Sequence, residues 1–331
     1  MRSVSLTALI LALALPLSAG AQLGGIGATG TTDSFTLSID DQYPAPYSRV
    51  AVSISSDSLD LAGASLSVSV GGKEIYKGSA RTFAVTLGGS GSITVVKATV
   101  VYQGATYSQS LSIQPQDVVL VAEPIASVPP LYPGNPSIPM GGNVRLVAVA
   151  NLRDTNGKTS GAAGYAYSWT VDDTKAFNAS GIGKSSIIVA APLQYRDSKI
   201  SVDVRSPDGK LVGGTSFTLS AGEPSVRIYE NDPLLGIRYE HALTGSYAIK
   251  GAESTLYAAP FSFPMTDGAP LVQWYLNGSL AQTGSLITLR PAGSGEGTAS
   301  LSLTASSGSS DVSQGLSLLF GGAKSTNIFG L

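Results

Sequence analysis

The sequence has no cysteine and only one histidine, His241, among its 331 residues. Without a thiol, disulfides, zinc–thiolate sites, iron–sulfur clusters and cysteine nucleophiles are all excluded. A Ser–His–acid triad would have to use His241. This histidine follows Arg238, Tyr239 and Glu240 in a proline-bearing segment, so we expect it in an exposed loop without a catalytic role.

Charged side chains are also scarce. They make up 13% of the sequence, about half of the roughly 25% that is usual in soluble domains. The net charge is −2, and the lysines and arginines form no cluster. A protein that binds nucleic acid needs a basic surface to displace counterions from phosphate, so we expect no nucleic-acid partner. The hydrophobic content of 43% allows a sizeable core and argues against disorder.

The longest hydrophobic run, at 6–17, is shorter than the roughly 20 residues that span a bilayer as a helix. Arg2 precedes this run, and the small-x-small pattern Ala19-Gly20-Ala21 follows it. These features predict a signal peptide that is cleaved before Gln22. We therefore expect a secreted, periplasmic or cell-surface protein without a stable transmembrane segment after cleavage.

No segment has the periodicity of a helix of three turns. Alternation of apolar and polar residues with a period of two dominates instead, as in Leu66, Val68 and Val70 with intervening serines, or Leu301 and Leu303. Such alternation predicts strands with one buried and one solvated face.

Three segments share one order of features, which indicates an internal repeat. Each opens with a strand that ends near an acidic residue and a proline, and continues with a second strand, a central strand and a closing hairpin. Trp169 and Trp274 occupy matching places in two central strands, where the first repeat has Val68. The expected strands are 35–39, 49–55, 66–70, 94–102 and 107–113, then 118–122, 143–150, 167–171, 199–205 and 215–219, then 225–229, 254–259, 272–276, 298–305 and 316–320.

The stretch 124–139 contains six prolines, and taken alone it has the composition of a linker between domains. The repeat alignment favours a different interpretation, because the other two repeats also carry proline between their first and second strands. We therefore expect this stretch to connect the first two strands of the second repeat.

The pattern resembles bacterial immunoglobulin-like and PKD-like β-sandwich modules of exported surface proteins. The resemblance rests on tryptophan in a middle strand, on the turn residues Asp172 and Asn277-Gly278 that follow it, and on the closing hairpin. The resemblance covers residues 33–321, and it identifies no functional residues because such folds host many functions.

We therefore predict an all-β chain of tandem immunoglobulin-like β-sandwich domains. The predicted segments are a signal peptide at 1–21, a glycine-rich flexible leader at 22–32, sandwiches at 33–115, 116–222 and 223–321, and a tail at 322–331.

Few residues qualify as a site. The acidic pair Glu230 and Asp232 is a weak candidate for Ca²⁺, which prefers several oxygen ligands, because the charge density is low and a plain turn is the favoured interpretation. Trp169 and Trp274 alternate with polar neighbours, so we expect them in the core. Tyr275 falls on the opposite face and is the candidate for stacking on a sugar.

These observations predict an exported, non-enzymatic structural or adhesive protein of the cell surface that needs no cofactor. Catalysis at neutral pH requires a tuned acid, base, nucleophile or metal, and the sequence shows no such constellation. The expected partner is a protein of the cell envelope or of a surface filament, or a glycan. The alternative is a carbohydrate-binding accessory protein of the cell envelope.

Overall fold

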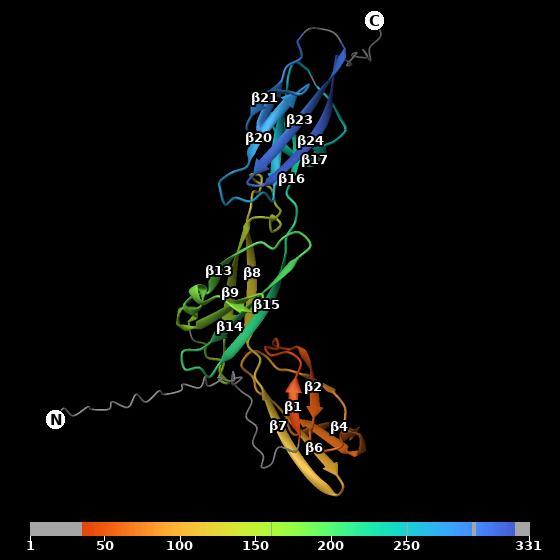
Figure 1. Ribbon diagram of the computed structural model, residues 1–331, viewed down its shortest axis with the longest axis vertical. Helices are drawn as coiled ribbons and strands as arrows, with labels where there is room; N and C mark the ends of the chain where they lie inside the picture. Colours follow the sequence, from red (N-terminus) through yellow and green to blue (C-terminus); the bar gives the residue numbers. More distant parts are fainter. Residues whose placement is uncertain (1–34, 160, 250, 293–295, 322–331) are drawn as a thin grey trace, which may run out of the picture.

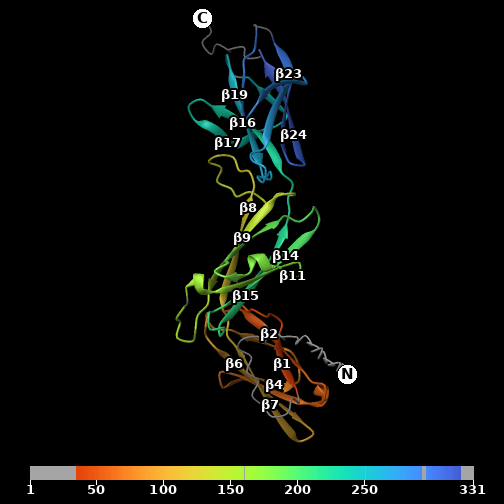
Figure 2. The same ribbon diagram turned by 60° about the vertical axis from the view of Figure 1, so that its left-hand side comes forward.

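The computed structural model describes residues 35–159, 161–249, 251–292 and 296–321. Within these ranges the chain forms three β-sandwich modules that lie end to end (Figures 1 and 2), and its only helical elements are three short 3₁₀ turns. None of the helical segments described is long and apolar enough to cross a membrane. The predicted signal peptide (1–21), leader (22–32) and tail (322–331) lie outside the described residues.

In module 1, a three-stranded sheet faces a four-stranded sheet. The first sheet has the order β1 (Thr36–Ile39), β2 (Arg49–Ser55) and β5 (Phe83–Thr86). The second has the order β4 (Lys73–Ser79), β3 (Ser65–Val70), β6 (Thr94–Tyr102) and β7 (Ala105–Ile113). Alternate residues of both sheets are buried between them, with Val68 at the centre of the core.

Module 2 repeats this arrangement. One sheet has the order β13 (Ser186–Ala190), β9 (Asn143–Asn151) and β8 (Asp117–Ile125). The other has the order β11 (Thr174–Lys175), β10 (Ala166–Val171), β14 (Asp197–Arg205) and β15 (Val212–Ser220), and β12 (Gly181–Ile182) also pairs with β10. The proline-rich stretch connects β8 and β9, which pair with each other. This confirms the placement that the repeat alignment predicts.

Module 3 has a four-stranded and a five-stranded sheet. One has the order β17 (Gly236–Leu243), β16 (Ser225–Asp232), β19 (Ser254–Phe261) and β22 (Leu286–Leu289). The other has the order β18 (Ser246–Ala248), β24 (Ser310–Phe320), β23 (Gly297–Ser307), β20 (Leu271–Leu276) and β21 (Ser279–Thr283). Strand β18 runs parallel to β24, whereas the other pairings of these two sheets are antiparallel.

The tryptophans lie in the cores, as the alternation predicts. Trp169 and Trp274 are both 0% exposed. Each indole Nε1 donates a hydrogen bond of 2.9 Å to a backbone carbonyl, that of Lys184 and that of Gly284. Burying a tryptophan between two facing sheets is typical of immunoglobulin-like sandwiches, and the partner for the N–H avoids the cost of a buried orphan donor. The predicted fold class, tandem immunoglobulin-like sandwiches, is confirmed.

One expectation about secondary structure is wrong. His241 lies in strand β17, paired with β16, and not in a loop, although its side chain is exposed as expected. The β16–β17 pairing has a register shift between Tyr229 and Asn231. A bulge disrupts the regular alternation on which strand prediction depends.

Candidate functional site: the two junctions between modules

Residues 126–142, which we call the proline strap, leave module 2 after β8, lie against module 3 (Figure 2) and return to module 2, where Met140 N–H donates to the Gly222 carbonyl. Ser127 makes four bonds there. Its backbone N–H donates to the Phe263 carbonyl at 2.9 Å, and its carbonyl accepts from Ser262 N–H at 2.8 Å. Its hydroxyl accepts from Phe263 N–H at 3.0 Å and donates to the Pro260 carbonyl at 3.1 Å. Because Ser127 is only 7% exposed, solvent offers little competition for these bonds.

An aromatic cluster forms where the strap meets module 3. Tyr132 of the strap packs edge-to-face against Tyr239 and Phe261, with ring centroids 5.7 and 4.9 Å away. Tyr239 in turn packs against Tyr229 and Tyr257 at 5.2 and 6.4 Å. Tyr229 and Tyr257 are 3% and 7% exposed, although they belong to the outer face of the sheet. The cluster is thus a small apolar core outside the sandwich, built from two modules.

The phenol of Tyr239 ties the cluster to the strap. Its hydroxyl donates a hydrogen bond of 2.7 Å to the Pro130 carbonyl. Burial, with smaller contributions from the neighbouring Tyr257 and Tyr229, raises the pKa of Tyr239 to about 12. Burial also raises the pKa of Tyr257. Tyr239 therefore keeps its proton, and remains a donor to the strap, well above neutral pH.

A hollow of about 170 Å³ opens at one end of the aromatic cluster. The strap contributes Val128, Tyr132, Asn135 and Pro136, and module 3 contributes Ser225, Arg227, Phe261 and Ser262. Arg227 is its one charged lining residue. The hollow therefore combines apolar walls with one cation and a few neutral polar groups.

The junction between modules 1 and 2 is built differently. The Ser90 hydroxyl of module 1 donates a hydrogen bond of 3.3 Å to the Asn151 carbonyl of module 2. Where the chain enters module 2, the buried amide of Gln116 accepts from Arg153 N–H at 2.7 Å and donates to the Arg153 carbonyl at 2.9 Å. Gly91 of module 1 approaches so closely that a Cβ there would lie 2.6 Å from the carbonyl oxygens of Arg153 and Asp154. The contact is made by backbone and polar groups, and no aromatic pair contributes to it among the described residues.

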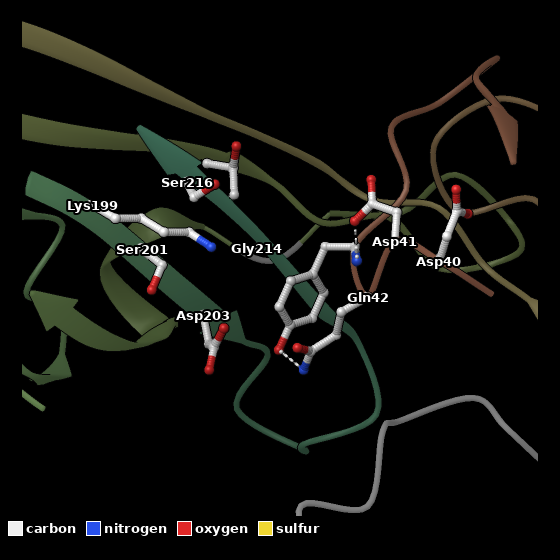
Figure 3. A pocket seen from close by; sticks show the side chains of 10 residues that line it. Asp40, Asp41, Gln42, Lys199, Ser201, Asp203, Gly214 and Ser216 are labelled. Carbon is white, nitrogen blue, oxygen red and sulfur yellow. Dashed lines mark hydrogen bonds between the residues drawn. The ribbon is translucent and has the colours of Figure 1, made fainter. Parts of the chain in front are cut away.

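A polar hollow of about 400 Å³ lies at this first junction (Figure 3). The β1–β2 loop contributes Asp40, Asp41, Gln42 and Tyr43, and β14 and β15 contribute Lys199, Ser201, Asp203, Gly214, Thr215 and Ser216. The Tyr43 ring lies against Gly214, where a Cβ would come within 2.5 Å of the ring. Burial and the neighbouring Asp203 raise the pKa of Tyr43. The ring therefore serves the contact between modules.

The acidic pair predicted for calcium lies in strand β16. Asp232 Oδ1 accepts hydrogen bonds from the N–H groups of Leu234 and Leu235 at 2.8 and 2.9 Å, which caps the β16–β17 turn. The pKa of Arg238 is raised chiefly by its hydrogen bond to Glu240. The charges of Asp232 and Glu230 make smaller contributions in the same direction. No group of three or more His, Cys, Asp or Glu side chains suited to a metal occurs in the described part of the chain.

Tyr275 lies on the opposite face of β20 from Trp274, as expected, but it is half-buried. Its hydroxyl donates to Gln273 Oε1 at 3.3 Å. The sequence-based candidates Glu230, Asp232 and Tyr275 do not line either junction hollow. The residues that do, above all Arg227 and Tyr132, come from strands and loops that no short motif connects.

No family model matches the sequence, and no curated protein matches it. Among solved structures, the central fibronectin-III array of RIM-binding protein is 11% identical, with 86% of this chain and 95% of that chain covered and a TM-score of 0.29. Three N-terminal domains of the highly immunogenic outer capsid protein of bacteriophage RB49 are 11% identical over 86% and 98%, with a TM-score of 0.24. Fibronectin(III)-like modules of Clostridium thermocellum CbhA are 10% identical over 59% and 95%, with a TM-score of 0.22.

Structural similarities as weak as these support no inference about function. The class of the protein follows from its own sheets and cores, which form a tandem array of immunoglobulin-like β-sandwiches with no helical domain among the described residues.

Proposed function

We propose that the chain is an exported, non-enzymatic spacer of the cell surface, which holds an adhesive or structural surface away from its point of attachment. The proline strap is the observation that carries this proposal. A flexible tether needs no contact between domains, whereas here a segment of module 2 is bonded to module 3 through Ser127 and packed into the aromatic cluster. Domains are expected to move relative to one another where their interface is small and polar. The apolar contact between the strap and module 3 therefore favours a rigid arrangement of these two modules.

The alternative function, a carbohydrate-binding accessory protein, finds less support at Tyr275, because that ring is half-buried and its hydroxyl is bonded to Gln273. Stacking on a sugar requires an accessible ring face.

Distances between spin labels test the spacer proposal directly. The absence of cysteine means that labels at introduced cysteines are site-specific. We expect a narrow distance distribution between labels at the exposed Thr218 of module 2 and the exposed Gln282 of module 3. Tyr132→Ala should broaden this distribution by loosening the strap, whereas Leu131→Ala, at a side chain that is 97% exposed, should leave it unchanged. A broad distribution in the parent protein would refute a rigid spacer.

A further inference from the structure

The hollow beside the aromatic cluster exists only when the strap is docked. Half of its lining residues come from the strap and half from module 3. Its volume of about 170 Å³ is below the roughly 300–1,000 Å³ of sites that enclose drug-sized ligands. It suits one small ring unit, such as one sugar residue of a longer chain.

Arg227 gives this hollow its chemical character. The arginines Arg145, Arg238 and Arg290 form ion pairs with Glu123, Glu240 and Glu253. Arg227 forms no ion pair with any residue that the structure describes, and no carboxylate lines the hollow. A guanidinium offers five donors in a planar fork that matches a carboxylate in a bidentate manner. This guanidinium, without an ion pair among the described residues, therefore favours a ligand with a carboxylate.

The remaining lining groups favour a sugar as the carrier of that carboxylate. Tyr132 and Phe261 meet edge-to-face at 4.9 Å, and with Val128 and Pro136 they form an apolar wall. The Asn135 amide and the Ser225 hydroxyl can each donate and accept, which matches sugar hydroxyls. Small-molecule sites commonly combine apolar walls with a few convergent polar groups in this way.

We propose that this hollow binds one uronic acid residue of an acidic polysaccharide, with the carboxylate on Arg227 and hydroxyls on Asn135 and Ser225. The inference goes beyond the spacer role and needs only a docked strap. The polar hollow at the first junction does not compete, since three carboxylates oppose one lysine there. The docked strap would then serve both rigidity and adhesion.

Calorimetric titration of the full chain with oligogalacturonate tests the proposal. The parent should bind the acid, whereas the methyl ester of the same oligosaccharide, which keeps the ring but lacks the charge, should bind at least about tenfold more weakly. Arg227→Ala should weaken binding of the acid by about tenfold or more, and Arg227→Lys should retain part of the affinity because it keeps the charge without the fork.

Arg49→Ala provides the matched control, because it removes another exposed arginine, from module 1, and leaves the hollow intact. This variant should bind like the parent. Equal binding of acid and ester, no loss in Arg227→Ala, tighter binding of an acidic peptide, or no binding of oligogalacturonate would each overturn the proposal. The spin-label distances report the spacer role separately, so failure of one proposal is distinguishable from failure of the other.

Discussion

The two junctions connect neighbouring modules through different kinds of contact. Between modules 1 and 2, polar and backbone groups meet at Ser90, Asn151 and Gly91, a single ring, Tyr43, lies against Gly214, and a polar hollow remains beside them. Between modules 2 and 3, the strap covers aromatic side chains on the outer face of a sheet. Polar contacts exchange readily with water and contribute about 1 kcal/mol each. Separation of an aromatic cluster exposes apolar surface, so the second junction is expected to be the stiffer one.

The residues on the outer faces of the sheets explain why only the second junction has an aromatic cluster. In module 1 the outward residues of β1 and β2 include Thr36, Ser38 and Ser53, which are suited to solvent. In module 3 the corresponding face carries Tyr229 and Tyr257, which water would solvate poorly. A sheet with two apolar faces must be covered on both. Tyr239 of β17 packs on Tyr229 and Tyr257, and Tyr132 of the strap packs on Tyr239 in turn, so the coupling of two modules follows from this second layer.

The largest effect is expected from Trp274→Ala, which should lower the free energy of unfolding of module 3 by about 3–5 kcal/mol through the cavity it leaves. The protein has two tryptophans, so fluorescence of this variant reports Trp169 in module 2 alone. If the strap couples the modules, the module 2 transition in urea should also shift to lower concentration. An unchanged Trp169 midpoint would show that the strap does not couple module 2 to module 3.

A smaller effect is expected at the first junction from Gly91→Ala. Its φ of 81° and the approach of its Cβ position to the Arg153 carbonyl should together cost about 1–3 kcal/mol. Gly104→Ala is the matched control, with φ of 82° and no atom within 4 Å, so it isolates the cost of the backbone conformation. Small-angle scattering should show module 1 displaced in the first variant only. Equal behaviour of both variants would mean that the contact at Gly91 does not hold the modules together.

Period-two alternation and the repeat were enough to predict the sandwiches, because each core strand obeys the same rule of one buried face. Val68, Trp169 and Trp274 could be assigned to cores on that ground, and all three are 0% exposed. Strand β17 was missed because its pairing with β16 contains a bulge. The short strands β5 and β13 were missed because four or five residues carry little periodicity.

The junctions were beyond prediction for a different reason. Tyr132 and Tyr239 meet although 107 residues separate them, and Arg227 faces a hollow that two modules share. No local pattern specifies such a contact. A partial signal was available in β19, where Leu256, Tyr257 and Ala258 are apolar in succession. A strand that is apolar on both faces indicates cover on both faces, but it does not indicate what provides the cover.

The smallest effect expected concerns pH and the strap. The pKa of Tyr239 is raised from its ordinary value of 10.0 to about 12 in the folded protein, chiefly by burial. Its neutral form is therefore favoured by folding, and its contribution to stability is complete below pH 10 and is lost as the pH rises through about 12. We expect the coupling between modules 2 and 3, measured by the Trp169 transition in urea, to fall across this interval.

Tyr239→Phe lacks the bond to the Pro130 carbonyl and should cost about 1 kcal/mol at neutral pH. It should also show a shallower loss between pH 10 and 12, because it lacks the Tyr239 hydroxyl that titrates in this interval. Tyr195→Phe, at a ring that is 95% exposed, should follow the parent at every pH. If the Trp169 midpoint depends on pH in the same way in the parent and in Tyr239→Phe, another group causes the alkaline transition. Tyr239 would then not contribute to the coupling between the modules.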